Sequence, residues 1–200
     1  MNKFEKRSMI AYNKKADNYD NTSDGKFTLK FKNMLLQMID VKDDNTVLDV
    51  ACGNGRFLKM LSDKYSFNGY GTDISDKMIE QAKLLNPSMD FSVGSCERMP
   101  FADNFFDVII TCAAYHHFPN VNNFAKEAYR VLKKNGKIYI ADVYYPKTVR
   151  AINNLLLPLL RAGDVRIYSP DEITETLKNA GFQNNNYVID SNVQIVNAYR

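Results

Sequence analysis

The chain has 200 residues, of which 45% are hydrophobic and 24% are charged, and its formal net charge is +3. These values are typical of one globular domain with an ordinary core, alone or with a small lid, and they exclude a disordered or fibrous chain. Because the net charge is small and basic residues are evenly mixed with acidic ones, the charge pattern argues against a nucleic-acid partner.

The sequence also argues against export, a membrane span and a metal site. No stretch approaches the roughly 18 apolar residues of a membrane span, and charges interrupt the start, "MNKFEKRSMIAYNKK", where an export signal has its apolar core. Three cysteines without CxxC spacing, Cys52, Cys96 and Cys112, predict small buried side chains in a reducing cytoplasm. The only two histidines, His116 and His117, are adjacent and would need distant carboxylates, so we expect no metal.

In chain order, the first 45 residues show only helical patterns. These are "FEKRSMIAYNKKADNYD" and "KFTLKFKNMLLQMI", linked by the turn-rich "NTSDG". We therefore predict that residues 1–45 form a helical lid and that residues 46–200 form the main domain. Tyr12 and Tyr19 are seven residues apart, so they lie on one helical face.

From residue 46, strand patterns alternate with helical ones. Short runs rich in Val, Ile, Tyr and Phe predict strands at 46–51, 68–73, 89–94, 106–113 and 136–143. Between them, "GRFLKMLSDKY", "SDKMIEQAKLL" and "NNFAKEAYRVLKK" have apolar residues at helical spacing. This alternation predicts βαβ units, and hence a parallel sheet with helices on both faces.

The last part of the chain changes pattern. The apolar stretch at 153–163 predicts a helix packed on the sheet or a dimer surface rather than a membrane anchor. Another helix begins with Ser169 as its N-cap and stops at Gly181. The short turn Ser191-Asn192 then joins "NNYVID" to the strand run in "NVQIVNAYR", so these strands must be antiparallel. We predict an α/β fold, a doubly wound Rossmann-like, seven-stranded mixed sheet with a C-terminal antiparallel hairpin.

The stretch "VLDVACGNGRF" at 47–57 predicts a ligand-binding turn. Open α/β sheets bind ligands at the carboxyl ends of their strands. Gly53 and Gly55 allow positive φ and a close approach of a ligand to the main chain. Eighteen residues after Gly55, Asp73 ends the second strand, where a carboxylate can accept hydrogen bonds from both hydroxyls of a ribose. The pattern therefore indicates a nucleoside ligand.

Two other nucleotide-binding motifs fit less well. The dinucleotide fingerprint needs a third glycine where this chain has Leu58, so an NAD-type oxidoreductase is disfavoured. The Walker phosphate loop is absent from the sequence. A lone Gly-x-Gly is more often a plain turn, and it gains weight here from Asp73 and from the motifs that follow.

Five segments in order carry a family resemblance: "VLDVACGNG", "GTDIS", "GSCERMPFADNFFDVIITCAAYHHFPN", "EAYRVLKKNGKIYIADV" and "YSPDEITETLKNAGF". Over residues 10–185 the chain resembles class I S-adenosylmethionine-dependent methyltransferases of the small-molecule type, which includes the quinone-biosynthesis C-methyltransferases. The resemblance implies S-adenosylmethionine as the cofactor and methyl transfer as the activity. A module that binds this cofactor without catalysis stays open as an alternative.

The resemblance also implies the cofactor site. The implied residues are Asp49, Ala51, Gly53 and Gly55 around the methionine part, Asp73 at the ribose, and Ile74, Met78, Ser95 and Cys96 around the adenine. Ala51 and Ser95 depart from the family pattern, which often has glycine and aspartate there; Ala is a mild change if its φ is negative. Asp49 as a helix cap, and Ile74 and Met78 as core residues, are the structural alternatives.

The segment "AAYHHFPN" implies the acceptor end of the site. It puts Tyr115, His116 and His117 where a methyl acceptor would lie, and imidazole is well suited to proton transfer at neutral pH. We take these three residues as catalytic candidates. The alternative is that the histidines cap the next helix or fill space. The Asn/Asp-Pro-Pro-aromatic string of nucleic-acid amino methyltransferases is absent here.

The acceptor is predicted to be a small, partly apolar molecule. The lid, the loop after 113 and the insertion at 143–169 are rich in Tyr, Leu and Ile, with Arg161 and Arg166 as the charges considered for an anionic group. An aromatic acceptor, or one with a single acidic group, fits this lining. We expect the face with Tyr12 and Tyr19 to close over the cofactor, and a monomer or a homodimer.

Overall fold

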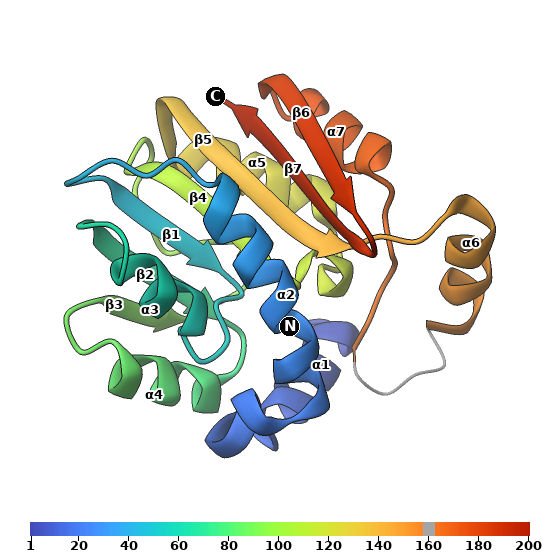
Figure 1. Ribbon diagram of the computed structural model, residues 1–200, viewed down its shortest axis with the longest axis horizontal. Coiled ribbons are helices and arrows are strands. Elements are labelled where there is room, and N and C mark those ends of the chain that lie inside the picture. The colour runs from blue at the N-terminus through green and yellow to red at the C-terminus, as the bar shows by residue number, and fades with distance from the viewer. Residues whose placement is uncertain (158–162) are drawn as a thin grey trace.

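The computed structural model describes residues 1–157 and 163–200, and its centre is one seven-stranded sheet of order β3-β2-β1-β4-β5-β7-β6 (Figure 1). The parallel strands are β1 (Thr46–Val50), β2 (Asn68–Asp73), β3 (Asp90–Val93), β4 (Phe106–Cys112) and β5 (Leu132–Val143). The hairpin of β6 (Gln183–Asp190) and β7 (Val193–Tyr199) is antiparallel, and β7 pairs antiparallel with β5. The predicted fold class is confirmed.

Helices lie on both faces of this sheet and beyond its edges. They are α1 (Lys3–Asn13), η1 (Ala16–Asn21), α2 (Ser23–Met38), α3 (Arg56–Ser62), α4 (Asp76–Leu85), η2 (Tyr115–His117), α5 (Val121–Val131), α6 (Lys147–Leu156) and α7 (Pro170–Asn179). The predicted start of α7 is confirmed, because the Ser169 hydroxyl accepts from the Glu172 N–H and the Glu172 carboxylate accepts from the Ser169 N–H. This capping box satisfies two N–H groups that the helix itself leaves free.

Two hydrophobic clusters fill the space between sheet and helices. Successive residues of a strand point to opposite faces, so Leu48 joins the cluster beneath α5 and α7, whereas Val47 joins the cluster beneath α2, α3 and α4. Both residues are fully buried. This explains why the central strands read as continuous apolar runs rather than as alternating ones.

The first 45 residues divide into two parts. Helix α2 places Phe31 and Leu35, both fully buried, in the cluster on its face of the sheet. By contrast, α1 and η1 lie at the lower edge of the view in Figure 1, beyond the sheet. Only α1 and η1, residues 3–21, are therefore placed to act as a cover.

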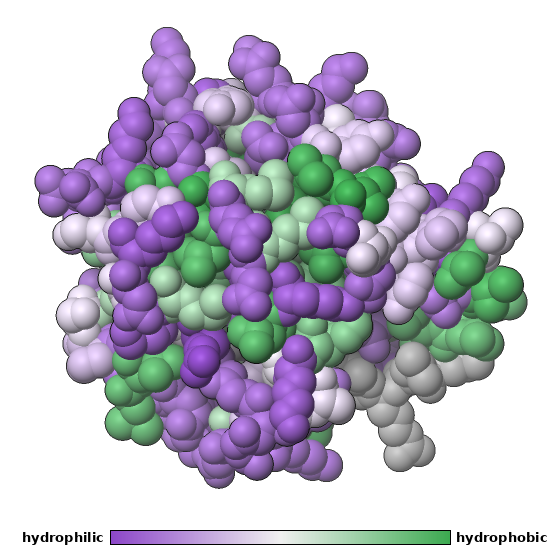
Figure 2. Space-filling model, viewed as in Figure 1, coloured by the Kyte–Doolittle hydropathy of each residue, from purple (hydrophilic) through white to green (hydrophobic). Residues whose placement is uncertain are grey.

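Helix α6 stands apart from the rest of the molecule at the right of Figure 1 and has no buried residue. Its exposed apolar side chains are Val149, Ile152, Leu155 and Leu156, and Figure 2 shows a green patch at the same edge. A helix packed on the sheet, the first alternative for 153–163, is therefore wrong for residues 153–156 of α6. The next residue, Leu157, is partly buried against the cluster beneath α2, α3 and α4. No helix in the described ranges is long and apolar enough to cross a bilayer.

Candidate functional site

A cavity lies at the carboxyl ends of the parallel strands, beneath α1 and η1. The predicted site residues that line it are Tyr12, Tyr19, Asp49, Ala51, Gly53, Asp73, Ile74, Ser95, Cys96 and His117. Residues of α1 and η1 thus meet residues of the segment after β4 in one cavity. All three cysteines also line it, and they are free thiols, with Cys52 buried and the other two only partly buried.

The structure requires glycine at the two positions of the turn after β1 for different reasons. Both have positive φ, 53° at Gly53 and 73° at Gly55, as predicted. A Cβ at Gly53 would meet nothing within 4 Å, so this position leaves open space in the cavity wall. A Cβ at Gly55 would lie 2.7 Å from Asn86 Nδ2 and 3.1 Å from Ala82 Cβ. Gly55 therefore permits the packing of α4 and does not line the cavity.

Ala51 has a left-handed backbone, with φ of 59°. The condition under which alanine would be a mild change there, a negative φ, is not met, and the conformation costs about 1–2 kcal/mol for a residue with a Cβ. Ala113, after β4, has φ of 57° and lines the same cavity. Backbone strain of this kind gathers at functional sites, where the surrounding structure maintains it.

Asp73 connects the end of β2 to the turn after β1. Its Oδ2 accepts from the Gly53 N–H at 2.8 Å, and its Oδ1 accepts from the Ser75 N–H at 2.8 Å. Burial raises the pKa of Asp73, although the two N–H groups act to lower it. Each carboxylate oxygen has a second lone pair, so both can still accept from a ligand.

Asp49 is a buried carboxyl group at the end of β1. Burial raises its pKa to about 8, although the ammonium group of Lys32 acts to lower it. Its Oδ1 is buried and has no hydrogen-bond partner within the described part of the chain. Lys32, on α2, donates to Thr28 Oγ1 at 2.7 Å, and both residues line the cavity.

The sequence prediction missed Thr28 and Lys32. They are four residues apart on α2, on the side of the helix that carries the buried Phe31 and Leu35. Two polar residues at core-facing helical positions were the signal that could have revealed them.

Around the proposed adenine position, the predicted residues divide. Ile74, Ser95 and Cys96 line the cavity, and the Ser95 hydroxyl donates to Glu5 Oε1 at 2.7 Å. Met78 is fully buried and packs with Ala16 and Tyr19 instead. The core alternative therefore holds for Met78, because η1 covers that side of α4.

A second cavity adjoins the first and shares Tyr12, Thr28, Ala113 and His117 with it. Its apolar wall consists of Phe27, Phe31, Val143, Tyr145, Leu157 and Ile167. Its charged or titratable wall consists of Lys15, Asp24, His116, Asp142 and Asp164. Lys15 and Asp24 form an ion pair with each other.

The two histidines lie in the wall of this second cavity. His116 donates from Nδ1 to Asp142 Oδ1 at 2.7 Å and from its backbone N–H to Asp142 Oδ2 at 2.8 Å. Nε2 of His117 lies 3.0 Å from the Tyr12 hydroxyl. Burial is the largest effect on both rings and lowers their pKa. At His116 the charge of Asp142, the hydrogen bond to Asp142 and the charge of Asp164 together outweigh burial and leave the pKa raised, whereas the pKa of His117 stays lowered.

Tyr115 does not lie with the histidines. It is fully buried, and its ring packs against Phe118, Phe124 and Tyr168 in the core. The prediction that Tyr115 faces an acceptor is therefore wrong. The cause is the short helix η2, in which successive side chains point in different directions, so Tyr115 enters the core while His116 and His117 reach the cavity.

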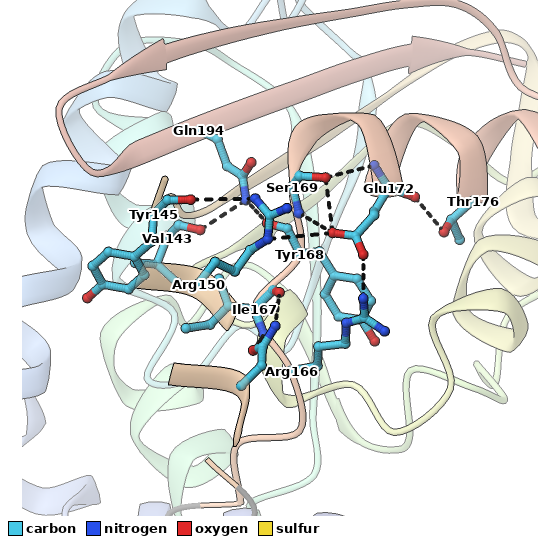
Figure 3. Close-up of polar contacts among 11 residues, drawn as sticks. Val143, Tyr145, Arg150, Arg166, Ile167, Tyr168, Ser169, Glu172, Thr176 and Gln194 are labelled. Carbon is cyan, nitrogen blue, oxygen red and sulfur yellow. Dashed lines mark hydrogen bonds and ion pairs between the residues drawn. The ribbon is translucent and has the colours of Figure 1, made fainter. Parts of the chain in front are cut away.

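Of the two predicted arginines, Arg166 lines neither cavity. Arg166 is exposed and pairs with the Glu172 carboxylate on α7, with its guanidinium 5.3 Å from the ring centre of Tyr168 (Figure 3). Arg161 lies outside the described residues. The prediction that Arg166 faces an anionic group of the acceptor is therefore wrong.

Comparisons with known proteins agree with this geometry. A family model described as a methyltransferase domain matches residues 48–140. The chain is 28% identical to the demethylmenaquinone methyltransferase of Thermotoga maritima, over 90% of each chain. It is 29% identical to the ubiquinone/menaquinone biosynthesis C-methyltransferase UbiE of Rickettsia bellii, over 92% of this chain and 88% of the relative.

Two solved structures show the same fold. A putative methyltransferase in complex with the Haloferax volcanii Trm112 methyltransferase activator has a TM-score of 0.80 at 19% identity, over 94% of this chain and 96% of the other. A SAM-dependent methyltransferase from Aquifex aeolicus has a TM-score of 0.72 at 21% identity, over 94% and 97%. At these identities the likeness concerns the fold alone.

Proposed function

Because the chain belongs to the class I S-adenosylmethionine-dependent methyltransferases, we propose that it methylates a small, partly apolar molecule held in the second cavity. The observation that carries this proposal is the pair of adjoining cavities with a shared wall. The residues of the motifs line the first cavity, and the second, with its apolar wall, opens beside it.

The first cavity suits the cofactor in its donors and its free space. We assign Asp73 to the ribose hydroxyls, Asp49, Ala51 and Gly53 to the methionine part, and Ile74, Ser95 and Cys96 to the adenine. Two observations support this assignment. A bound ligand would fill the open space at Gly53, and it would provide a hydrogen-bond partner for Asp49 Oδ1, which has none among the described residues.

The cofactor supplies a methyl group already activated on a sulfonium, and transfer is an in-line displacement. The protein therefore needs chiefly to hold the acceptor in line and to exclude water. Tyr12, Ala113 and His117 line both cavities and mark where the methyl group would cross. We keep His116 and His117 as the catalytic candidates.

The wall of the second cavity favours an acceptor without an acidic group. Among the described residues it contains three carboxylates, on Asp24, Asp142 and Asp164, and its lysine, Lys15, is paired with Asp24. An anionic acceptor would meet like charges there. The two similar relatives, a demethylmenaquinone methyltransferase and a ubiquinone/menaquinone biosynthesis C-methyltransferase, support an aromatic acceptor with apolar substituents.

A methyl-release assay tests this function. We expect that cofactor with a labelled methyl group transfers label chiefly to a small-molecule pool from cells, and not to separate RNA or protein pools. Label found chiefly in RNA or protein would contradict the acceptor class. Cofactor binding without transfer to any pool would favour the non-catalytic alternative.

We also propose that α1 and η1 form the moving part of the predicted lid. Tyr12 and Tyr19 line the cofactor cavity with ring centres 6.0 Å apart, which places aromatic faces near a sulfonium. Polar contacts hold this segment across the cavity mouth, from Glu5 to Ser95 and from Asp20 to Asn54. Entry of the cofactor would require these contacts to open.

Limited proteolysis measures this closure. We expect S-adenosylhomocysteine to protect cleavage sites within residues 1–30, because the ligand would hold α1 and η1 closed. Cleavage in the β6–β7 hairpin, whose strand β6 is largely exposed, serves as the control and should not change. Equal cleavage of residues 1–30 with and without the ligand would leave the lid without support.

A further inference from the structure

Three side chains from two distant segments converge in the wall of the second cavity. Asp164 Oδ1 lies 3.5 Å from His116 Nε2 and 3.4 Å from His117 Nδ1. One ligand atom from each of the three residues lies within 4.8 Å of the others. These nitrogen–oxygen separations exceed the 2.7–3.2 Å of ordinary hydrogen bonds, so direct hydrogen bonding does not explain the cluster.

The two separations from Asp164 Oδ1 match those between ligand atoms of one metal ion. In a tetrahedral site with bonds of 2.0–2.1 Å, neighbouring ligand atoms are about 3.4 Å apart. Two imidazoles and one carboxylate, with an open fourth position, are a ligand set for Zn²⁺, Fe²⁺ and similar ions. We propose that His116, His117 and Asp164 bind one divalent transition-metal ion.

The opposite nitrogens of both rings are arranged as in metal sites. Nδ1–H of His116 donates to Asp142, and Nε2 of His117 is hydrogen-bonded to Tyr12. Such outer contacts fix the ring orientation and leave the other nitrogen free to bind a metal. Among the described residues, Nδ1 of His117 is buried without a hydrogen-bond partner. A cation at the cluster would satisfy this atom and balance the charges of Asp142 and Asp164.

Backbone contacts bring Asp164 to the histidines. The N–H groups of Val165 and Arg166 donate to the His116 carbonyl oxygen, at 2.8 and 3.2 Å. The next residues are also fixed, since Asn154 bonds both backbone groups of Ile167 and Gln194 donates to the Tyr168 carbonyl oxygen at 2.8 Å (Figure 3). The backbone that follows Asp164 is thus held beside the histidines. The sequence predicts no metal because the two adjacent histidines would need a distant carboxylate as a further ligand. Asp164 is such a carboxylate, and it lies beside them.

The open position would face the cavity that we assign to the acceptor. There the ion would bind an oxygen or nitrogen of the acceptor and orient it. Both ring nitrogens of each histidine are then engaged, so positioning by the ion replaces the hypothesis of proton transfer. This use of the ion rests on the proposed function, whereas metal binding itself does not.

Titration with Co²⁺ tests the site. The protein, without an affinity tag and freed of metal by a chelator, should bind one Co²⁺ per chain, with visible absorption typical of nitrogen and oxygen ligands at low coordination number. Zn²⁺ should displace it. Asp142→Asn, which leaves the three proposed ligands in place but changes the group that receives the His116 Nδ1–H, should weaken binding by about 10- to 100-fold. Asp164→Asn should weaken it at least as much.

Asp24→Asn is the matched control, because Asp24 lines the same cavity but pairs with Lys15. It should bind Co²⁺ as the parent does. Titration of each variant with S-adenosylhomocysteine shows that the fold is retained, and failure of the parent there would contradict the proposed function alone. The absence of saturable Co²⁺ binding by the parent, or equal binding by Asp164→Asn and Asp24→Asn, would overturn the metal site. If Asp164→Asn does not fold, His117→Gln takes its place under the same criterion.

Discussion

Asp73→Ala is expected to weaken S-adenosylmethionine binding by at least tenfold. Two hydrogen bonds from ribose hydroxyls to a carboxylate contribute about 1.5–3 kcal/mol each, and about 1.4 kcal/mol already corresponds to tenfold. The change also removes the acceptor of the Gly53 and Ser75 N–H groups, so the turn at the cofactor loses its connection to β2. Calorimetric titration of parent and variant measures the difference.

Two further variants separate binding from folding. Asp73→Asn keeps one carbonyl oxygen for a backbone N–H and should unfold close to the parent temperature while still binding more weakly. Asp90→Ala removes an exposed carboxylate from the neighbouring strand β3 and should change neither property. If Asp73→Ala binds the cofactor as tightly as the parent, the ribose assignment is wrong.

The sequence was sufficient for the fold because its signals are local. Strand runs alternate with amphipathic helices, and the two residues between β6 and β7 permit only an antiparallel hairpin. The position of the turn beside the cavity was predictable for the same reason, since Gly53 lies in the turn after β1 and Asp73 ends β2. Where strands are parallel, their carboxyl ends meet at one edge, so the chemistry-bearing residues there are brought together by topology alone.

The rest of the site depends on contacts between distant segments and on backbone angles. The sequence does not show that φ of Ala51 is positive, nor that η2 turns Tyr115 into the core beside His116. The sequence predicts Met78 as a cofactor contact because no pattern near Met78 in the sequence shows that η1 covers α4. Asp164 reaches the histidines only through the backbone bonds to His116, which no local spacing reveals.

Asp49→Asn is expected to change stability and cofactor binding in opposite directions. Burial raises the pKa of Asp49 to about 8, whereas an unfolded aspartate titrates near about 3.9. Between these values the folded chain must hold a proton that the unfolded chain releases, so this group lowers stability increasingly as pH rises from about 4 to 8. Asparagine removes that cost. The variant should therefore unfold at a higher temperature than the parent at pH 7, with the difference vanishing near pH 4.

Cofactor affinity should fall at least tenfold in the same variant, because the amide lacks the charge that we assign to the ammonium group of the methionine part. That pairing would ionise Asp49, so the parent should release a proton on binding at pH 7, whereas the variant should not. Calorimetry in buffers of different ionisation enthalpy measures this proton, and thermal unfolding across pH measures the stability. Asp43→Asn, an exposed carboxylate before β1, is the control for both. If Asp49→Asn is more stable than the parent but binds the cofactor with the same affinity and the same proton release, Asp49 is a buried residue of β1 without a role in binding. The methionine part would then bind elsewhere in the cavity.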